Sequence, residues 1–152
     1  MKKFFAVLGV IFLIIIVLGA IGFAFVAKRG NALDKESKVY ADSAIPAIVT
    51  NWDVSALLVR ASPEFLQAAK NQRLDQGFRW FGTLGRLQKC DPAKGQAIMS
   101  ATTLNGGRIT AQYSAKATFE KGEATVTLEL IKQGDQWQIF KFAVFSPQLA
   151  PK

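Results

Sequence analysis

Residues 96–146, QAIMSATTLNGGRITAQYSAKATFEKGEATVTLELIKQGDQWQIFKFAVFS, form the stretch that decides the fold. Three polar segments containing glycine divide this stretch: Asn105-Gly106-Gly107, Glu120-Lys121-Gly122 and Gln133-Gly134-Asp135. Glycine and asparagine tolerate the positive φ angles that tight hairpin turns require. The pattern therefore predicts an antiparallel meander of four strands, at residues 96–104, 108–119, 123–132 and 136–145.

The second and third of these strands alternate between apolar and polar residues. Apolar side chains occupy the odd positions from Ile109 to Phe119 and the even positions from Ala124 to Leu130. A period of two is typical of a strand with one buried face, so the opposite face of the sheet is predicted to be exposed to water.

The last strand breaks this alternation. Trp137 and Ile139 share one parity, whereas Phe142 and Val144 share the other. A β-bulge near Phe140-Lys141 would keep all four apolar side chains inside, and we predict one there.

A long apolar run lies near the start of the chain. Residues 4–27 are uncharged and follow Met1-Lys2-Lys3. As a helix this run is roughly 36 Å long, against about 30 Å for the hydrocarbon core of a bilayer. A cleaved signal peptide is the alternative, with Gly22-Phe23-Ala24 as its cleavage site, but its apolar region should measure only about 7–15 residues. The length favours an uncleaved transmembrane anchor.

The charges beside the run suggest an orientation. Lys2 and Lys3 favour a cytoplasmic amino terminus, although Lys28 and Arg29 on the other side reduce the asymmetry. The expected location is a bacterial inner (cytoplasmic) membrane, crossed once, with the domain in the periplasm or outside the cell.

Composition excludes several classes of function. The net charge is +8, but once the four basic residues beside the anchor are set aside, 15 basic residues face 11 acidic ones, so nucleic-acid binding is not expected. The chain has no histidine and one cysteine, Cys90, which excludes His-based triads and makes a transition-metal site or other cofactor unexpected. Cys90 is either a small buried residue or a thiol for an intermolecular bridge.

Helical signals fill the segment between the anchor and the sheet. Residues 33–50 are predicted to form a helix with an apolar stripe that includes Val39, Tyr40 and Ile48, kinked or interrupted at Pro46. Asp53 is a candidate N-cap for a helix at 54–60, and Ser62-Pro63 a start signal for the next. A longer helix is predicted at 71–84, ending before Gly85.

Helices followed by an antiparallel meander predict an α+β roll. The chain resembles membrane-tethered bacterial members of the nuclear transport factor 2-like, or cystatin-like, superfamily over residues 33–147. The resemblance rests on the order of elements and on these segments: Asn51-Trp52-Asp53, Ala61-Ser62-Pro63-Glu64-Phe65-Leu66, Gly134-Asp135-Gln136-Trp137-Gln138-Ile139 and Phe145-Ser146-Pro147. The predicted organisation is an N-terminal transmembrane anchor with a short cytoplasmic start (1–28), a linker or first helical turn (29–38), the nuclear transport factor 2-like domain (39–147) and a tail (148–152).

The resemblance implies that the helices pack against the sheet and leave a hydrophobic cavity between them. The candidate lining residues are aromatic, and each has a simpler interpretation as core: Tyr40, Trp52, Phe78, Phe81, Tyr113 and Trp137. The superfamily includes ketosteroid isomerase, which needs a general base in the cavity. Asp53 is the only carboxylate near the expected mouth and stands at an N-cap position, so no catalytic residue is predicted.

Two surfaces are candidates for partner contacts. The polar sheet face argues against an obligate homodimer through that face. A set of basic residues could contact an acidic protein or anionic lipid headgroups, or could simply be solvated: Lys70, Arg73, Arg79, Arg86 and Lys89.

Three functions follow, of which the first is preferred. The chain is expected to be a non-enzymatic single-pass membrane protein whose domain is an accessory or scaffold module of an envelope complex. The alternatives are a tethered domain that binds a small hydrophobic ligand or lipid in its cavity, and an isomerase-like enzyme.

Overall fold

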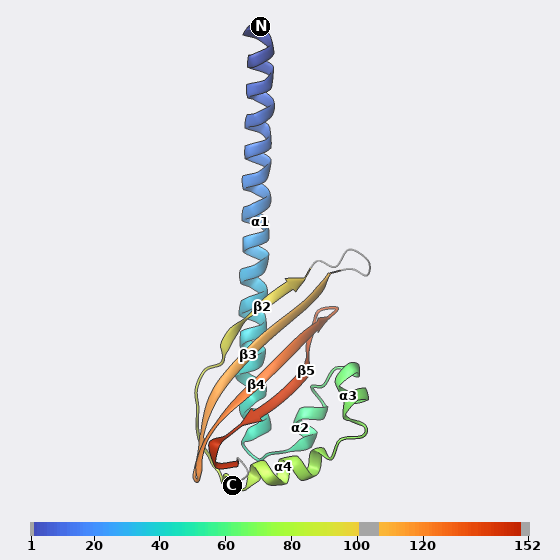
Figure 1. The fold of residues 1–152 in the computed structure, drawn as a ribbon, viewed down its shortest axis with the longest axis vertical. Helices are drawn as coiled ribbons and strands as arrows, with labels where there is room; N and C mark the ends of the chain where they lie inside the picture. The colour runs from blue at the N-terminus through green and yellow to red at the C-terminus, as the bar shows by residue number, and fades with distance from the viewer. Residues whose placement is uncertain (1, 101–106, 150–152) are drawn as a thin grey trace. The chain divides into compact units, whose positions relative to one another are not determined.

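The structure is a computed structural model that describes residues 2–100 and 107–149, with the backbone alone given for residues 2–11 and 26. It divides into two compact units, Met1–Leu33 and Asp34–Lys152, which are described separately. The first unit is the amino-terminal part of helix α1 (Lys2–Val49). The second holds the rest of α1 and all other elements (Figure 1).

The first unit is an apolar helix whose described side chains are largely exposed. The side chains of residues 12–25 are exposed. Among the described residues, this is the one helix that is long and apolar enough to cross a membrane. Leucine and isoleucine side chains exposed in this number are typical of a surface that lipid covers.

The second unit contains an antiparallel sheet. In the described residues it has five strands: β1 (Leu87–Cys90), β2 (Lys94–Ser100), β3 (Arg108–Phe119), β4 (Gly122–Gln133) and β5 (Gln136–Phe145). The order is β1-β3-β4-β5, and β2 also pairs with β3. β1 and β2 thus follow one another along the same edge of β3.

The prediction of four strands was therefore wrong in number and close in position. β3 and β5 have the predicted bounds, and β4 differs by one residue at each end. β1 was missed because four residues are too few to show an alternating pattern. The predicted end of β2 and most of the Asn105-Gly106-Gly107 turn lie outside the described residues.

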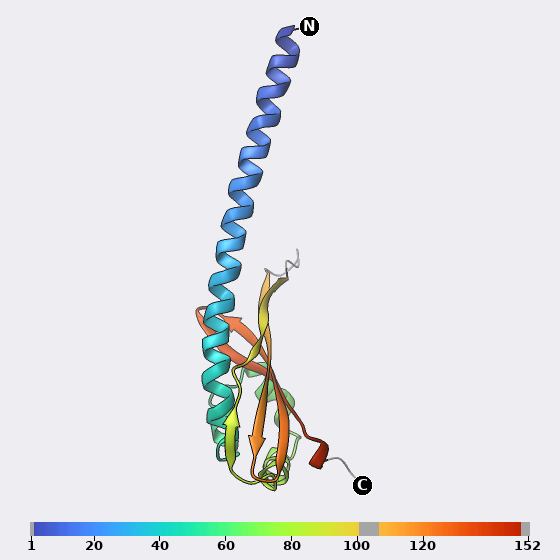
Figure 2. The same cartoon turned by 90° about the vertical axis from the view of Figure 1, so that its left-hand side faces the viewer.

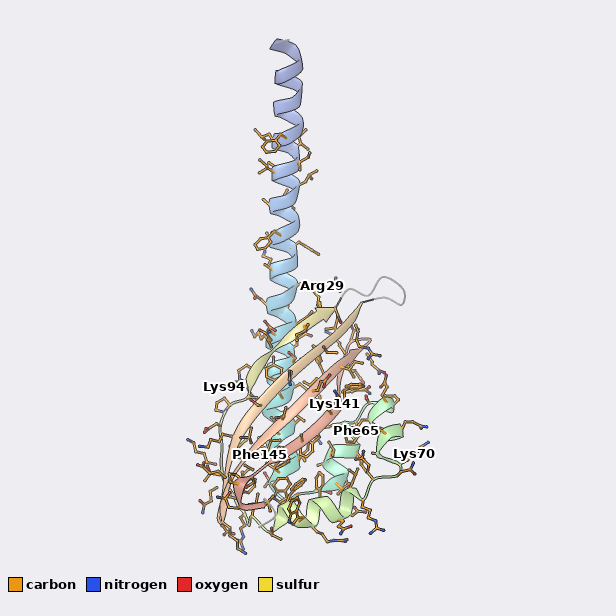
Figure 3. The ribbon with its side chains drawn as sticks, viewed as in Figure 1. Arg29, Phe65, Lys70, Lys94, Lys141 and Phe145 are labelled. Atoms are coloured by element: carbon orange, nitrogen blue, oxygen red, sulfur yellow. The ribbon has the colours of Figure 1, made fainter. Side chains whose placement is uncertain are left out.

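The bulge in β5 is confirmed. Ile139 pairs with Leu130 and Lys141 with Glu129, which leaves Phe140 as the extra residue. The side chains of Trp137 and Ile139 are buried, and those of Phe142 and Val144 are half-buried. Phe145, at the end of β5, is exposed (Figure 3).

Three short helices follow α1: α2 (Val54–Leu58), α3 (Pro63–Ala69) and α4 (Leu74–Gly82). Asp53 caps α2, because its Oδ1 accepts a hydrogen bond from the Ser55 amide at 2.9 Å. Ser62 caps α3 through the Phe65 amide at 3.2 Å. Both predicted caps are confirmed, while α2 and α4 are shorter than predicted.

Pro46 does not interrupt α1, contrary to prediction. The helix continues to Val49, and the Thr50 amide donates to the Pro46 carbonyl at 3.0 Å. Pro46 removes the one hydrogen bond that its missing N–H would donate to the Asp42 carbonyl, and the helix ends only three residues later, so the effect is confined to its last turn.

Helices cover one face of the sheet. Inward residues of the strands contact the helical segments: Tyr113 meets Ser37, Phe142 meets Phe78, and Phe119 meets Trp52. Figures 1 and 2 show residues 34–49 of α1 lying along the sheet on this side. The other face carries polar residues such as Gln112, Ser114 and Lys116 and is open to water, as predicted.

Candidate functional site

The six aromatic residues predicted to line one cavity lie in three places. Trp52, Phe78 and Phe81 form a cluster in which the Trp52 ring centroid lies 6.1 Å from Phe78 and 5.2 Å from Phe81. Phe119 and Phe142 extend this cluster to the sheet. The three predicted residues are brought together, but as packed core.

Tyr113 is part of the contact between α1 and the sheet. It is fully buried, its hydroxyl lies 2.8 Å from Ser37 Oγ, and it donates to the Asp34 carbonyl at 3.1 Å. Small side chains line this contact, and all are buried: Ala41 and Ala44 on α1 and Ala111, Ala115 and Ala117 on β3. Alanines let a helix approach a sheet closely, and Ala41 and Ala115 also line a hollow of about 220 Å³ at the edge of this contact.

Tyr40 and Trp137 line a groove of about 650 Å³ on the surface of the domain. We call it the α1–β5 groove. Its walls come from α1, the end of α2 and the start of β5: Glu36, Val39, Tyr40, Ser43, Val59, Arg60, Asp135, Gln136, Trp137 and Gln138. Among the described residues no hollow is lined by all six predicted aromatics: Tyr40 and Trp137 line this groove, and Trp52 and Phe78 line a separate hollow.

The apolar rims are the feature of this groove that sequence reasoning missed. Val39 is 64% exposed and Val59 is 78% exposed. The sequence placed Val39 on the inward stripe of its helix, but among the described residues of α1 the buried positions are Leu33, Ser37, Ala41, Ala44, Ile45, Ile48 and Val49. The buried stripe of α1 is therefore rotated slightly about the helix axis relative to the predicted stripe. This rotation leaves Val39 exposed beside the groove.

The charged groups of the groove are partly paired. Glu36 accepts a hydrogen bond from Lys132 Nζ at 2.6 Å, and this hydrogen bond and the lysine charge hold the pKa of Glu36 below its usual value. Lys132 also lies 5.5 Å from the centroid of the Trp137 ring. Arg60 donates to the Ala56 carbonyl at 2.7 Å, which fixes the guanidinium near the end of α2.

Tyr40 is a neutral phenol in this setting. Its burial raises its pKa, and the positive charge of Arg60 offsets only part of the rise. A neutral hydroxyl can donate or accept a hydrogen bond but does not act as a base at neutral pH. The groove therefore offers apolar rims, an aromatic wall, a neutral hydroxyl and one guanidinium.

The basic residues singled out by the sequence come from several elements. Lys70 and Arg73 lie at the connection between α3 and α4, Arg79 lies on α4, Arg86 lies just before β1, and Lys89 lies in β1. Figure 3 labels Lys70 at the end of α3. Lys89 is paired with Asp91 at 3.0 Å. The stronger candidate for a binding surface is therefore the α1–β5 groove.

These observations define the class of protein. Over the described residues the chain is an α+β protein with a five-stranded antiparallel sheet and one helix that is long and apolar enough to span a membrane. The chain matches no protein-family model, no curated protein and no solved structure. Its function must therefore be inferred from its own geometry.

Proposed function

We propose that the chain is a non-enzymatic, single-pass protein of a bacterial inner membrane, with its amino terminus in the cytoplasm and its domain outside it. The domain has a nuclear transport factor 2-like fold and acts as an accessory module of an envelope complex. A protein partner in that complex binds at the α1–β5 groove. The apolar run at residues 4–27 supports the tether, and helices on one face of an antiparallel sheet support the fold.

The exposed valines beside the groove carry this proposal. Val39 and Val59 are largely exposed and line the groove together with Tyr40 and Arg60, so their burial by a partner would be favourable. Removing apolar area from water contributes about 25 cal/mol per Å². Exposed apolar side chains rimmed by polar ones are typical of protein interaction sites.

The shape of the groove favours protein as the occupant. A ligand site buries most of its ligand, about 70–90% of the surface. The α1–β5 groove has exposed rims, so an acyl chain lying in it would remain largely in water. A partner protein covers both the groove and its rims.

The assignment as a non-enzyme rests on the role of Asp53. This carboxylate is the one that the isomerase hypothesis needs as a base, and it is engaged as the cap of α2. Replacing it by alanine should cost about 1 kcal/mol of stability, as for other caps.

Site-specific photocrosslinking in native membranes tests the proposal. The full-length chain carries a photoreactive benzoylphenylalanine at Val59, and the matched control carries it at Lys121, which is exposed in the turn between β3 and β4. We expect one protein adduct from position 59 and none from position 121. If position 59 gives uncrosslinked monomer and no protein adduct, the proposed partner is excluded.

The second candidate is a tethered domain that binds a small hydrophobic molecule. It is favoured by the aromatic wall of the groove, where Tyr40 and Trp137 lie together. The same experiment separates the two, because a lipid adduct at position 59 in place of a protein adduct would support this function and exclude the first.

A further inference from the structure

The sheet narrows to two strands where β2 ends and β3 begins. The pairing of β3 with β4 starts at Thr110, whereas the pairing of β3 with β2 continues as far as Arg108. The last residues of β2 and the first of β3 therefore extend beyond β4 as a two-stranded ribbon. We call these residues, together with the adjoining Ile98, the ribbon end: residues 98–100 and 108–109.

The ribbon end carries apolar side chains on both of its faces. Ile98 is 47% exposed and Met99 is 43% exposed. Successive residues of a strand point to opposite faces, so these two side chains lie on opposite sides of the ribbon. Ile109, which pairs with Met99, is half-buried. A protein docked on one face of the sheet would cover only one of these sides, whereas a lipid layer surrounds both.

Two hydrogen bonds fix the direction in which the ribbon end extends. The amide of Ala93 donates to Asp42 Oδ1 at 2.7 Å, and the amide of Ala97 donates to Asp34 Oδ1 at 2.6 Å. Residue numbers rise along β2 while those of its partners on α1 fall, so β2 runs antiparallel to this part of the helix. The ribbon end therefore continues past Asp34, the residue at which the chain enters the second unit.

The apolar run of the proposed tether ends close to this point in the sequence. Ala27, its last residue, precedes Asp34 by seven residues. Seven residues measure roughly 10 Å as a helix and about 25 Å when fully extended. The ribbon from Ala97 to Ser100 covers roughly 10 Å. However the two units are arranged, the chain therefore keeps the ribbon end within reach of the bilayer surface.

The charge of the ribbon end suits a membrane surface. Its residues include one cation, Arg108, and no carboxylate. The Arg108 side chain is exposed and takes part in no ion pair within the described part of the chain. A basic side chain near the surface is attracted to anionic lipid, and its aliphatic stem can lie against apolar groups while the charge stays in water.

We propose that the ribbon end is a second membrane contact, in which Ile98, Met99 and Ile109 enter the boundary between the headgroups and the acyl chains. Arg108 lies at the level of the headgroups and binds anionic lipid. Interfacial segments reach about 5–10 Å into this boundary, which the length of the ribbon end allows. The inference rests on the proposed tether. It does not depend on the partner at the α1–β5 groove, which shares no residue with the ribbon end.

Fluorescence of the full-length chain in lipid vesicles tests this contact. Cys90→Ala removes the single cysteine, and the polarity-sensitive label NBD is then attached through Ile98→Cys or Met99→Cys. The matched control is Lys94→Cys, which is exposed on the same face of β2 as Ile98 and roughly 14 Å away (Figure 3). The vesicles contain phosphatidylcholine and phosphatidylglycerol, with or without a nitroxide spin label on the upper acyl chain.

The three labelled positions should differ in emission and in quenching. We expect the labels at positions 98 and 99 to emit at shorter wavelength than the label at position 94, and spin-labelled lipid to quench them about twofold or more. Emission at positions 98 and 99 equal to that at position 94 would overturn the proposal. Blue-shifted emission without quenching would also overturn it, because a second copy of the chain would then cover the ribbon end in place of lipid.

Arg108 supplies a test of the charge. In the chain labelled at position 99, Arg108→Gln should shift the balance between inserted and free ribbon ends about fivefold towards the free state in vesicles with phosphatidylglycerol. The effect should be smaller in pure phosphatidylcholine. The control is Arg86→Gln, at an exposed position before β1, which should leave the quenching unchanged. Equal quenching for the two variants would contradict the binding of anionic lipid by Arg108.

Flotation of the vesicles on a density gradient separates this inference from the proposed tether. A chain that floats with the vesicles but shows water-like emission at positions 98 and 99 retains the tether and overturns the ribbon contact. A chain that does not float contradicts the tether itself, and the ribbon contact with it.

Discussion

The environment of Cys90 makes it an unreactive thiol. The side chain is half-buried beside Asp42 and Asp91, in a hollow of about 220 Å³. Burial raises its pKa above the usual 9.0, and the charges of Asp91 and Asp42 raise it further. Because the thiolate is the nucleophile, a raised pKa lowers the reactive fraction at any pH below it.

We therefore expect Cys90 in the full-length chain to react with iodoacetamide at about pH 8 more slowly than a free thiol with a pKa of 9.0, of which about a tenth is ionised. The rate should keep rising as the pH passes 9.0. Asp91→Asn should speed the reaction, because it removes a negative charge, while Asp75→Asn should not. Equal rates for the wild type and Asp91→Asn would contradict this account.

Gly95 is required by the close approach of β2 to β3. A Cβ atom at this position would overlap the carbonyl oxygen of Gln112, which belongs to the backbone and cannot rotate away. Glycine within a strand often marks such an approach.

Gly95→Ala should therefore lower the free energy of unfolding by about 2 kcal/mol or more. The measurement is the midpoint of urea unfolding of the full-length chain in detergent, with Gly77→Ala as the control. The control removes a glycine from an open helix position and should raise stability slightly. An unchanged midpoint for Gly95→Ala would mean that β2 does not pair as described.

At the scale of elements, α1 is joined to the sheet by buried and edge hydrogen bonds. Tyr113 of β3 meets Ser37 at the centre of the contact. At the edge, the Asp34 and Asp42 carboxylates accept hydrogen bonds from the amides of Ala97 and Ala93 at 2.6 Å and 2.7 Å. These carboxylates cover amides at the outer edge of the sheet, which would otherwise be free to pair with another chain.

A double-mutant cycle on Tyr113 and Ser37 tests this joint. Tyr113→Phe removes the buried hydroxyl and should cost about 1–2 kcal/mol, and Ser37→Ala should cost a similar amount. The double variant should cost less than the sum, with a coupling of about 1 kcal/mol, because the two hydroxyls bond to each other. Strict additivity in urea unfolding would show that the two hydroxyls act independently.

The strands and helix caps could be predicted from the sequence because the residues that determine them are close together in the chain. The turn glycines bounded β3 to β5, the change of parity located the bulge at Phe140, and Asp53 and Ser62 stand directly before their helices. β1 has no such signal, since its four residues form a strand only because β3 continues past Ser114, where its pairing with the start of β2 stops.

The candidate site was harder to predict from the sequence than the strands, because it depends on which faces of distant elements pack together. Sequence reasoning named Tyr40 and Trp137 but grouped them with four other aromatic residues, whereas the structure places these two in a groove of their own. The exposure of Val39 and Val59 depends on the rotation of α1 and on the end of α2.

At the scale of the whole molecule, the proposed membrane tether depends on the exposed apolar helix. Residues 12–25 expose a continuous apolar surface that would be insoluble in water. A charged side chain in the middle of a membrane helix costs about 2.5–3.5 kcal/mol on insertion scales. Two lysines placed one turn apart should therefore cost about 5–7 kcal/mol, since positions 14 and 18 both lie near the middle of the apolar run at residues 4–27.

Extraction of membranes with alkaline carbonate provides the measurement. We expect the wild-type chain to remain in the membrane pellet, because an inserted helix resists extraction. The variant that combines Ile14→Lys with Leu18→Lys should move to the supernatant or fail to accumulate, because insertion becomes unfavourable. The control that combines Ile14→Leu with Leu18→Ile keeps the apolar surface and should stay in the pellet. Release of the wild-type chain by carbonate would show that residues 4–27 do not span the membrane. That result would exclude the proposed function as a membrane-tethered module.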